Sequence, residues 1–423
     1  MTIPAEIANT IVDPGAYARW DPVHAAFTEL RRRAELDVAE PDGFDPFWVV
    51  TRYDDIHFIE RRNELFHNGD RSAVLTPRAA DAKVREITGG SPHLVRALVQ
   101  MDNPDHRKYR RLTRDWFMPQ SLRGLEGRIR EIAREFVEHM LSLAPECDFA
   151  RDLAFLYPLR VIMEVIGVPE SDEARMLKLT QELFGNADTD LNRSGREEED
   201  ADLAALVNEV VTDFVQYFEA MTEDRRAHPR DDLASVIANG TIDGEPLGHL
   251  EAMSYYIIAA TAGHDTTSAS TASGAWALAE RPEQLAALKA DLSRLPAFIE
   301  ETVRWETPVK HFMRTATGDT ELRGRKIAKG DWLMLSYVSG NRDEDRFARP
   351  FEFDPARSPN KHVAFGYGPH VCLGQHLAKM EMRILWEELL PRLGSLELNG
   401  QPTRSAANFV SGPKSVPIRF TVA

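Results

Sequence analysis

The most informative stretch of this sequence reads Phe365-Gly-Tyr-Gly-Pro-His-Val-Cys372-Leu-Gly-Gln-His-Leu-Ala378. Its glycines allow the backbone of 365–374, called here the cysteine loop, to turn back on itself and pack closely beneath a flat ligand. We expect a helix to start near Leu373, so that unpaired N–H groups and the helix dipole stabilise negative charge on Cys372. Such surroundings lower the pKa of a thiol and favour the thiolate, the form that binds a metal. The cysteine alone does not decide between a metal ligand and a packing residue.

Composition narrows the classes of function. The chain of 423 residues is 43% hydrophobic and 28% charged, an ordinary balance for a globular protein with a large core. Its formal net charge of −16 argues against nucleic acid or an anionic membrane as a partner. We find no pattern of a secretory signal and no run of ~18 apolar residues, so we expect a cytoplasmic protein that makes no membrane contact. Cys147 and Cys372 are the only cysteines, too few for a zinc site, and the ordinary surroundings of Cys147 predict a packing role.

The hydrophobic pattern predicts a mainly α protein. Helical periodicity covers almost all of 104–237, with breaks at Pro119, Pro145, Pro158 and Pro169. It returns at 247–280, at 283–305 and in a last helix that ends near 391. Strand-like runs occur at 47–51, at the start of 53–56, within 319–338 and in the C-terminal tail, and 71–100 resembles a loop with short helices. Because no change in composition indicates a linker, we expect one helix-rich domain over 1–423 with small β-sheets.

A second signal lies in an apolar helical stretch that contains Ala262-Gly-His-Asp-Thr-Thr267. Glycine and threonine lower the stability of a helix, so their presence here needs a reason. The Thr266 hydroxyl can bond the carbonyl one turn back, near Ala262, and open the helix locally. Gly263 leaves room for a ligand against the backbone, and Asp265 supplies a titratable group beside it. Alone, the pattern is explained equally well by a helix kink with a solvated aspartate.

Two further spacings place charged side chains on one face of a helix. Glu301 and Arg304 are three residues apart, and His106 and Arg110 are four apart. Alone, the first pair is typical of a weak surface ion pair and the second of a solvated basic face. The basic helix has other cationic residues that could dock an acidic electron carrier, namely Arg107, Lys108, Arg111 and Arg114.

Over nearly its whole length the chain resembles the cytochrome P450 family. The pattern Phe-Gly-x-Gly-x-His-x-Cys-x-Gly-x-x-Leu-Ala is similar to the haem-binding signature of that family. The resemblance implies the P450 fold, with haem b between the oxygen-activating helix and the helix that follows the cysteine loop. It implies that Cys372 is the iron ligand. It also makes Glu301 and Arg304 a buried structural pair, tied to a downstream arginine or histidine.

The resemblance implies roles for further residues. Asp265 and Thr266, with Gly263 beside them, would relay protons during oxygen activation, which requires groups within hydrogen-bond reach. The residues expected to hold the haem are His106, Arg110, Arg314, Phe365, Gly366, His370 and Gly374. The residues expected to line the substrate pocket, together with the loop 72–98, are Ile258, Ala259, Ala262, Val309, Phe312, Phe409 and Val410. Lys310 and His311 either face this pocket and favour a polar or acidic substituent, or point away from it.

Within the family, the sequence is most similar to soluble bacterial members that hydroxylate terpineol, in the segments 261–268, 308–314, 372–382 and 408–414. This implies a mono-oxygenase that inserts one atom of dioxygen into a C–H bond of a small hydrophobic substrate, a terpenoid or an aromatic or alicyclic hydrocarbon. The chain shows no flavin or iron–sulfur motif, so electrons would come from a [2Fe–2S] ferredoxin and its FAD-dependent NAD(P)H reductase. The alternatives are a haem-thiolate peroxygenase, a non-oxygenase haem enzyme such as an isomerase or dehydratase, and a haem sensor. The pairing of Asp265 with Thr266 and the basic helix favour the mono-oxygenase.

Overall fold

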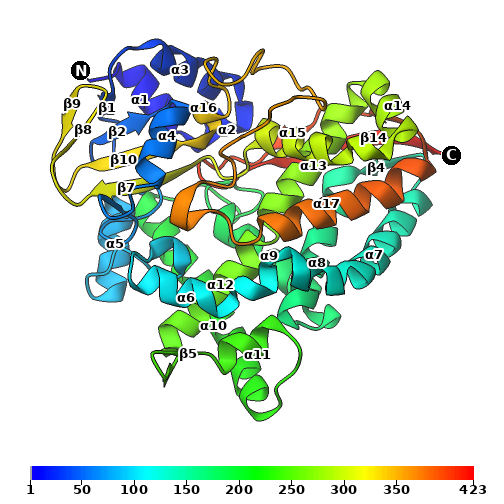
Figure 1. The fold of residues 1–423 in the computed structure, drawn as a ribbon, viewed down its shortest axis with the longest axis horizontal. Coiled ribbons are helices and arrows are strands. Elements are labelled where there is room, and N and C mark those ends of the chain that lie inside the picture. The colour runs from blue at the N-terminus through cyan, green and yellow to red at the C-terminus, as the bar shows by residue number, and fades with distance from the viewer. Residues whose placement is uncertain (1) are drawn as a thin grey trace.

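The computed structural model describes residues 2–423, in which helices predominate over small sheets (Figure 1). The helices of the first half are α1 (Ala5–Val12), α2 (Pro14–Arg19), α3 (Asp21–Arg32), α4 (Tyr53–Glu60), α5 (Arg78–Thr88), α6 (Asp105–Arg114), α7 (Pro119–Ser142), α8 (Leu156–Ile166) and α9 (Glu173–Phe184). Those of the second half are α10 (Asp200–Ala227), α11 (Leu233–Ala238), α12 (His249–Ala262), α13 (Asp265–Ala279), α14 (Pro282–Ala290), α15 (Leu295–Glu306), α16 (Tyr337–Gly340) and α17 (Gln375–Leu389). The mainly α class expected from the sequence is confirmed.

The largest sheet has five strands in the order β1-β2-β10-β7-β3. They are β1 (Asp37–Ala39), β2 (Phe47–Val50), β3 (Phe66–His67), β7 (His311–Ala316) and β10 (Trp332–Ser336). Only β2 and β10 pair in parallel within this sheet. The strands of the smaller sheets are β4 (Glu146–Asp148), β5 (Thr241–Ile242), β6 (Glu245–Pro246), β8 (Thr320–Leu322), β9 (Arg325–Ile327), β11 (Leu393–Leu398), β12 (Thr403–Arg404), β13 (Pro413–Ser415) and β14 (Pro417–Val422).

The core consists of three hydrophobic clusters. Successive residues of a strand point to opposite faces, so Phe47 and Val49 of β2 pack with α1–α3, whereas Trp48 and Val50 pack with α4. The third and largest cluster joins the helices from α6 to α15 and α17. Figure 1 shows the five-stranded sheet and α1–α3 on one side of the molecule, and α17 lying along α7 on the other. None of the described helices is long and apolar enough to cross a membrane.

The helical pattern at 247–280 is interrupted at Gly263 and His264, which separate α12 from α13. As predicted, the Thr266 hydroxyl donates to the carbonyl oxygen of Ala262, at 2.8 Å. A hydroxyl bonded one turn back in this way bends a helix. Gly263 lies on the wall of the main cavity, as expected, and a second contact also requires a glycine here. A Cβ at Gly263 would lie 2.8 Å from the Ile162 side chain, so close packing against α8 requires the glycine.

The strand expected at the start of 53–56 is wrong, because these residues begin α4. Asp54 and Asp55 lie in the first turn of this helix, where carboxylates complement the helix dipole. The backbone N–H of Tyr53 donates to the Asp343 carboxylate at 2.8 Å, which satisfies one of the unpaired donors at the helix start.

The helical pattern expected over 104–237, with breaks at four prolines, is also wrong between α9 and α10. Here Asp188 accepts a hydrogen bond from the backbone of Asp190, at 3.0 Å, and Asn192 accepts one from the backbone of Gly195, at 2.7 Å. Short polar side chains that bond to nearby N–H groups stabilise turns in competition with the helix. The segment between Phe184 and Asp200 is therefore irregular.

Candidate functional site

A cavity of about 860 Å³ brings together most of the residues expected at the site. Its wall is formed by α12 and α13, the cysteine loop, β7 and the segment 407–410. The wall contains Cys372 and all the residues expected to hold the haem, namely His106, Arg110, Arg314, Phe365, Gly366, His370 and Gly374. It also contains Gly263, Thr266 and the expected pocket residues Ile258, Ala259, Ala262, Val309, Phe312, Phe409 and Val410. Asp265 is not part of this wall.

The cysteine loop has the tight turn that its glycines predict. The backbone N–H of Cys372 donates to the carbonyl oxygen of Phe365 at 2.8 Å, which closes the loop. Gly366 and Gly368 have φ values of +65° and +70°, a region that residues with a side chain rarely adopt. A Cβ at Gly368 would also lie 2.4 Å from the backbone oxygen of Glu60, so this glycine is required for the contact with α4.

The surroundings of Cys372 differ from the expectation in two respects. Helix α17 starts at Gln375, with Gly374 as its N-cap, which is two residues later than expected. Burial raises the pKa of the Cys372 thiol, and outweighs the N–H groups of Gly374 and Gln375 and the charge of Arg110, all of which lower it. The expected lowering is therefore wrong for the free thiol. A bound cation changes the balance because a coordinating thiol loses its proton, and the N–H groups then stabilise the thiolate.

Four basic side chains surround the cavity beside the cysteine loop: His106 and Arg110 from α6, Arg314 from β7, and His370. The rings of His106 and His370 lie 3.9 Å apart, and neither Nε2 atom has a hydrogen-bond partner within residues 2–423. Burial and the nearby arginines lower the pKa of His106 to about 4 and that of His370 well below its usual value. Buried polar atoms need partners, so these four side chains, called here the basic cluster, fit a ligand with two carboxylates, as haem has.

His264 connects Asp265 to the protein interior. Its Nε2 lies 2.7 Å from the carbonyl of Phe155, which can only accept, so Nε2 carries the proton. Its Nδ1 is 3.1 Å from the Thr180 hydroxyl and 3.5 Å from Oδ1 of Asp265. Burial raises the pKa of Asp265, although His264 lowers it, and Oδ2 of Asp265 lacks a partner in the described chain. A carboxyl group whose pKa is raised thus directly precedes Thr266 in the chain.

Glu301 and Arg304 form a buried pair rather than a surface one, and both side chains are fully buried. Nε and Nη2 of Arg304 donate to the two carboxylate oxygens of Glu301, at 2.7 and 2.8 Å. The downstream arginine is Arg357, whose Nε donates to Glu301 at 3.0 Å. Asn360 donates to the same carboxylate at 3.1 Å. The network ties α15 to the segment that precedes the cysteine loop.

Lys310 and His311 point away from the cavity. Nζ of Lys310 donates to the carboxylate of Glu306 at 3.1 Å. Nδ1 of His311 lies 3.0 Å from the carbonyl of Asn408, and its Nε2 accepts from the backbone N–H of Leu75 at 3.1 Å. His311 therefore links β7 to the segments around Leu75 and Asn408 on the side of the wall away from the cavity. It offers no polar group to a substrate.

Two buried carboxyl groups near the site were not expected from the sequence. Burial raises the pKa of Glu60 on α4 to about 7 and that of Glu381 on α17 well above its usual value. The sequence does contain a signal that Glu381 is buried. It lies four residues after Leu377 and four before Leu385, on a helix face that is otherwise apolar.

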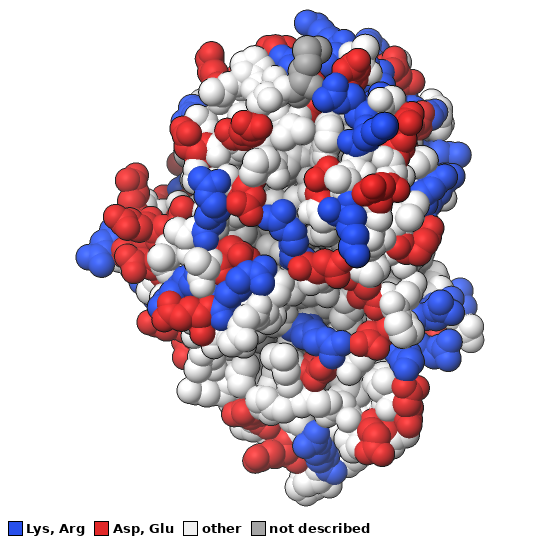
Figure 2. Space-filling model, turned by 90° about the vertical axis from the view of Figure 1, so that its left-hand side faces the viewer, with Lys and Arg blue, Asp and Glu red and all other residues white. Residues whose placement is uncertain are grey.

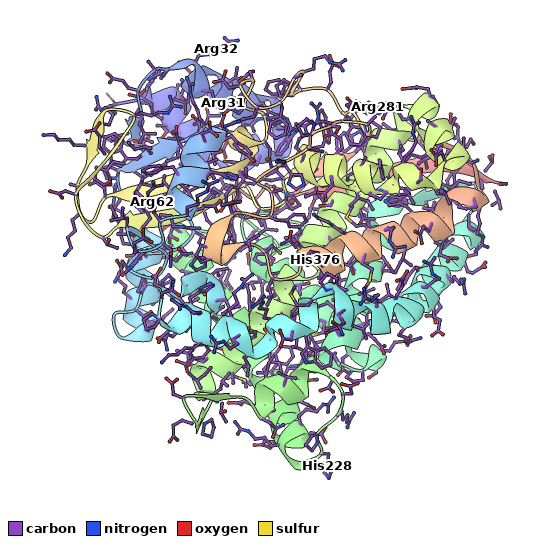
Figure 3. All side chains as sticks on the ribbon, in the orientation of Figure 1. Arg31, Arg32, Arg62, His228, Arg281 and His376 are labelled. Atoms are coloured by element: carbon purple, nitrogen blue, oxygen red, sulfur yellow. The ribbon has the colours of Figure 1, made fainter. Side chains whose placement is uncertain are left out.

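The basic helix α6 has only part of its expected cationic surface free. Arg107, Arg111 and Arg114 are exposed, whereas Lys108 is paired with Asp243. Figure 3 places His376, another exposed basic residue, at the start of α17 after the cysteine loop. Charges of both signs are interspersed over the face in Figure 2, so the surface seen there carries no single large charged patch.

Comparisons with known proteins agree with this geometry. The cytochrome P450 family model matches residues 16–418. Cytochrome P450-terp from a Pseudomonas species is 48% identical over 423 residues, which cover 100% of this chain and 99% of that protein. Linalool 8-monooxygenase from Pseudomonas putida is 30% identical over 96% of this chain and 97% of that protein.

Solved structures show the same relationship. The crystal structure of CYP108D1 from Novosphingobium aromaticivorans superimposes with a TM-score of 0.92 at 47% identity, covering 100% of both chains. CYP268A2 from Mycobacterium marinum, in complex with pseudoionone, gives a TM-score of 0.85 at 33% identity over 94% of both chains. The family resemblance drawn from the motifs is confirmed.

Proposed function

Because this chain belongs to the cytochrome P450 family of haem b mono-oxygenases, we propose that it hydroxylates a compact apolar substrate with electrons from a ferredoxin. The substrate class that we propose is a terpenoid, or an aromatic or alicyclic hydrocarbon of similar size. The single observation that carries this choice is the chemistry of the cavity wall away from the cysteine loop, where apolar groups predominate.

That part of the wall recognises shape rather than charge. Phe312 and Phe409 contact each other edge to face, with ring centres 5.3 Å apart, beside the small and aliphatic residues of α12. The hydroxyls of Ser72 and Thr76 bond each other at 2.8 Å, and so offer little to a ligand. Among the described residues, Arg110 and Arg314 are the only arginines or lysines on the wall, and both belong to the basic cluster. A neutral molecule held by its shape fits such a pocket.

Haem b, when bound, supplies the oxygen activation that places one oxygen atom in a C–H bond of the substrate and releases the other as water. Cys372 would ligate its iron through Sγ, with the Gly374 and Gln375 N–H groups stabilising the thiolate. The basic cluster would bind the two propionates through charge-assisted hydrogen bonds.

Thr266 and Asp265 would deliver the protons that the reaction consumes. The Thr266 hydroxyl, held on the Ala262 carbonyl, lines the cavity and can pass its proton inward. Asp265 directly precedes it and, because burial raises its pKa, binds a proton more tightly than a carboxyl group in water, so that it would replace the proton given up. His264 would keep Asp265 in place.

For the redox partner, we propose an acidic [2Fe–2S] ferredoxin that contacts Arg107, Arg111 and Arg114, and a flavin reductase behind it. Opposite charges on two surfaces raise the association rate, and salt weakens this effect. Arg111→Glu should slow electron transfer and reduce its dependence on salt, as measured by stopped-flow reduction. An unchanged rate would count against this surface.

The function as a whole is tested by a carbon-monoxide difference spectrum of the reduced protein, followed by titration with terpenoids, hydrocarbons and a fatty acid of similar size. We expect a thiolate-type spectrum, a low-to-high-spin shift with a neutral ligand, and a hydroxylated product when ferredoxin, reductase and NAD(P)H are supplied. Turnover with peroxide but none with the ferredoxin system would favour a peroxygenase instead. A spin shift confined to the fatty acid would contradict the proposed substrate class.

A further inference from the structure

The Glu60 carboxyl group lies where three other elements meet the end of α4, and the residue is only 4% exposed. The hydroxyl of Tyr337 on α16 donates to Oε1 of Glu60 at 2.6 Å. Nη2 of Arg314 on β7 is 3.7 Å from the same oxygen. A Cβ at Gly366 would lie 3.3 Å from Oε1, so the cysteine loop packs directly on the carboxyl. Oε2 has no partner within residues 2–423.

Arg314 connects this carboxyl group to the cavity. Its Nη1 donates to the backbone carbonyl of Met313 at 2.9 Å, its Nη2 is near Glu60, and the residue lines the cavity wall. A guanidinium has five N–H donors in a fixed fork, so one cation can serve Glu60 and a propionate together. When Glu60 is ionised, two carboxylates share this positive charge. When Glu60 is protonated, the charge belongs to the propionate alone.

Glu60 changes its charge at a physiological pH. Burial raises the pKa of Glu60 to about 7, although Arg314, the Tyr337 hydroxyl and the Tyr367 N–H group favour the ionised form. A glutamate in water has a pKa of about 4.3 and is therefore ionised at physiological pH. A propionate beside Arg314 would favour the protonated form of Glu60 further, because like charges repel.

We propose that Glu60 is a positioning residue that acts through Arg314, and that its charge tunes the reduction potential of the bound haem. A negative charge near the haem stabilises the oxidised, more positive state, so ionised Glu60 makes reduction harder. By linkage, the reduced state binds the Glu60 proton more tightly than the oxidised state does. Each electron accepted from a one-electron donor is then accompanied by partial uptake of a proton from water at Glu60. The inference rests on the proposed propionate site, and no feature of the substrate pocket enters it.

Other titratable groups surround Glu60 and define the competing explanation. The groups that face it or the propionate site are Arg314 on β7, Tyr337 on α16, Tyr367 and His370 in the cysteine loop, His57 on α4, Arg61 directly after α4, and His106 and Arg110 on α6. Arginines stay charged, and burial raises the pKa of Tyr337, so these groups do not titrate near neutrality. The imidazoles and the propionates themselves are the remaining candidates for a proton linked to reduction.

The test is a spectroelectrochemical titration of the haem-loaded protein from about pH 5 to pH 9, on both sides of the ordinary histidine value. The matched variants are Glu60→Gln and, as a control, Glu64→Gln at an exposed position. We expect the reduction potential of the wild type to fall as pH rises. The total fall should be about 59 mV for each tenfold difference in the proton affinity of Glu60 between the oxidised and the reduced protein. Glu60→Gln should lose this dependence and Glu64→Gln should keep it. A wild-type potential that does not vary with pH would overturn the proposal, as would a dependence retained in Glu60→Gln.

A second variant covers the case in which Glu60→Gln does not fold. Tyr337→Phe removes the hydrogen bond that favours ionised Glu60, so the potential should change at a higher pH than in the wild type. An unchanged midpoint would refute the role of Glu60. The carbon-monoxide difference spectrum of the same wild-type sample reports on Cys372 separately. A thiolate-type spectrum with a pH-independent potential would overturn this inference and leave the proposed function standing.

Discussion

Glu301→Gln removes the negative charge from a network whose three charged side chains are all buried. The side chains of Glu301, Arg304 and Arg357 are 0%, 0% and 7% exposed, so water cannot replace the lost carboxylate. Removing one partner of a buried ion pair costs about 3–5 kcal/mol, because the other charge is left uncompensated. Arg304 keeps its hydrogen bonds to the carbonyls of Asn341 and Pro350, at 2.8 and 3.0 Å, so we expect no loss beyond this range.

This loss translates into a measurable shift of the melting temperature. Unfolding entropy is about 2.1 cal/mol/K per residue, which for 423 residues amounts to about 0.9 kcal/mol/K. A loss of about 3–5 kcal/mol then lowers the melting temperature by about 3–6 °C. Differential scanning calorimetry of the haem-loaded protein measures this shift directly.

The matched control is Glu131→Gln, which breaks a pair of the same helical spacing on the surface. Arg128 and Glu131 are 3.2 Å apart with side chains 41% and 64% exposed. Exposed pairs contribute about 0.2–1 kcal/mol, so the control should melt within about 1 °C of the wild type. If Glu301→Gln melts no lower than Glu131→Gln, the buried network contributes no more to the free energy of unfolding than an exposed pair does. That result would refute the reasoning.

Three further changes address the chemistry. Cys372→Ser should abolish turnover and give a carbon-monoxide spectrum without the thiolate band; retention of that band would mean that Cys372 is not the ligand. Thr266→Ala should leave the substrate-induced spin shift intact but divert electrons to hydrogen peroxide, as measured by the ratio of product to NADH consumed; full coupling would contradict its proposed role. Asp265→Asn should slow turnover by about 10²-fold or more. Burial raises the pKa of Asp265, so ionisation of this carboxyl group favours the unfolded state at neutral and higher pH. Asp265→Asn should therefore raise the melting temperature more at pH 8 than at pH 4. Equal changes in melting temperature at the two pH values would contradict this.

Much of the site could be predicted because it depends on contacts between residues that are close along the chain. The bond from Thr266 to Ala262 spans four residues, and the pair of Glu301 with Arg304 spans three. Helix geometry alone brings such residues together. The turn of the cysteine loop is likewise local, because positive φ values at two positions require glycine.

Other features depend on contacts between distant segments, which no local pattern encodes. The stacking of His106 on His370, and the hydrogen bond between Glu60 and Tyr337, each join residues more than 200 positions apart. The same holds for His311, whose direction away from the cavity is determined by partners on two other segments.

Burial explains one error about charge and one charged group that the sequence analysis missed. The sequence shows N–H groups beside Cys372 but not the depth at which the thiol lies, and desolvation reverses the expected direction of its pKa shift. It likewise shows no sign that Glu60 is buried. The cofactor and the reaction class could thus be inferred from the order of the amino acids, because they rest on short motifs. The proton affinities and the shape of the pocket depend on how distant segments exclude water, and they became visible only once the chain was folded.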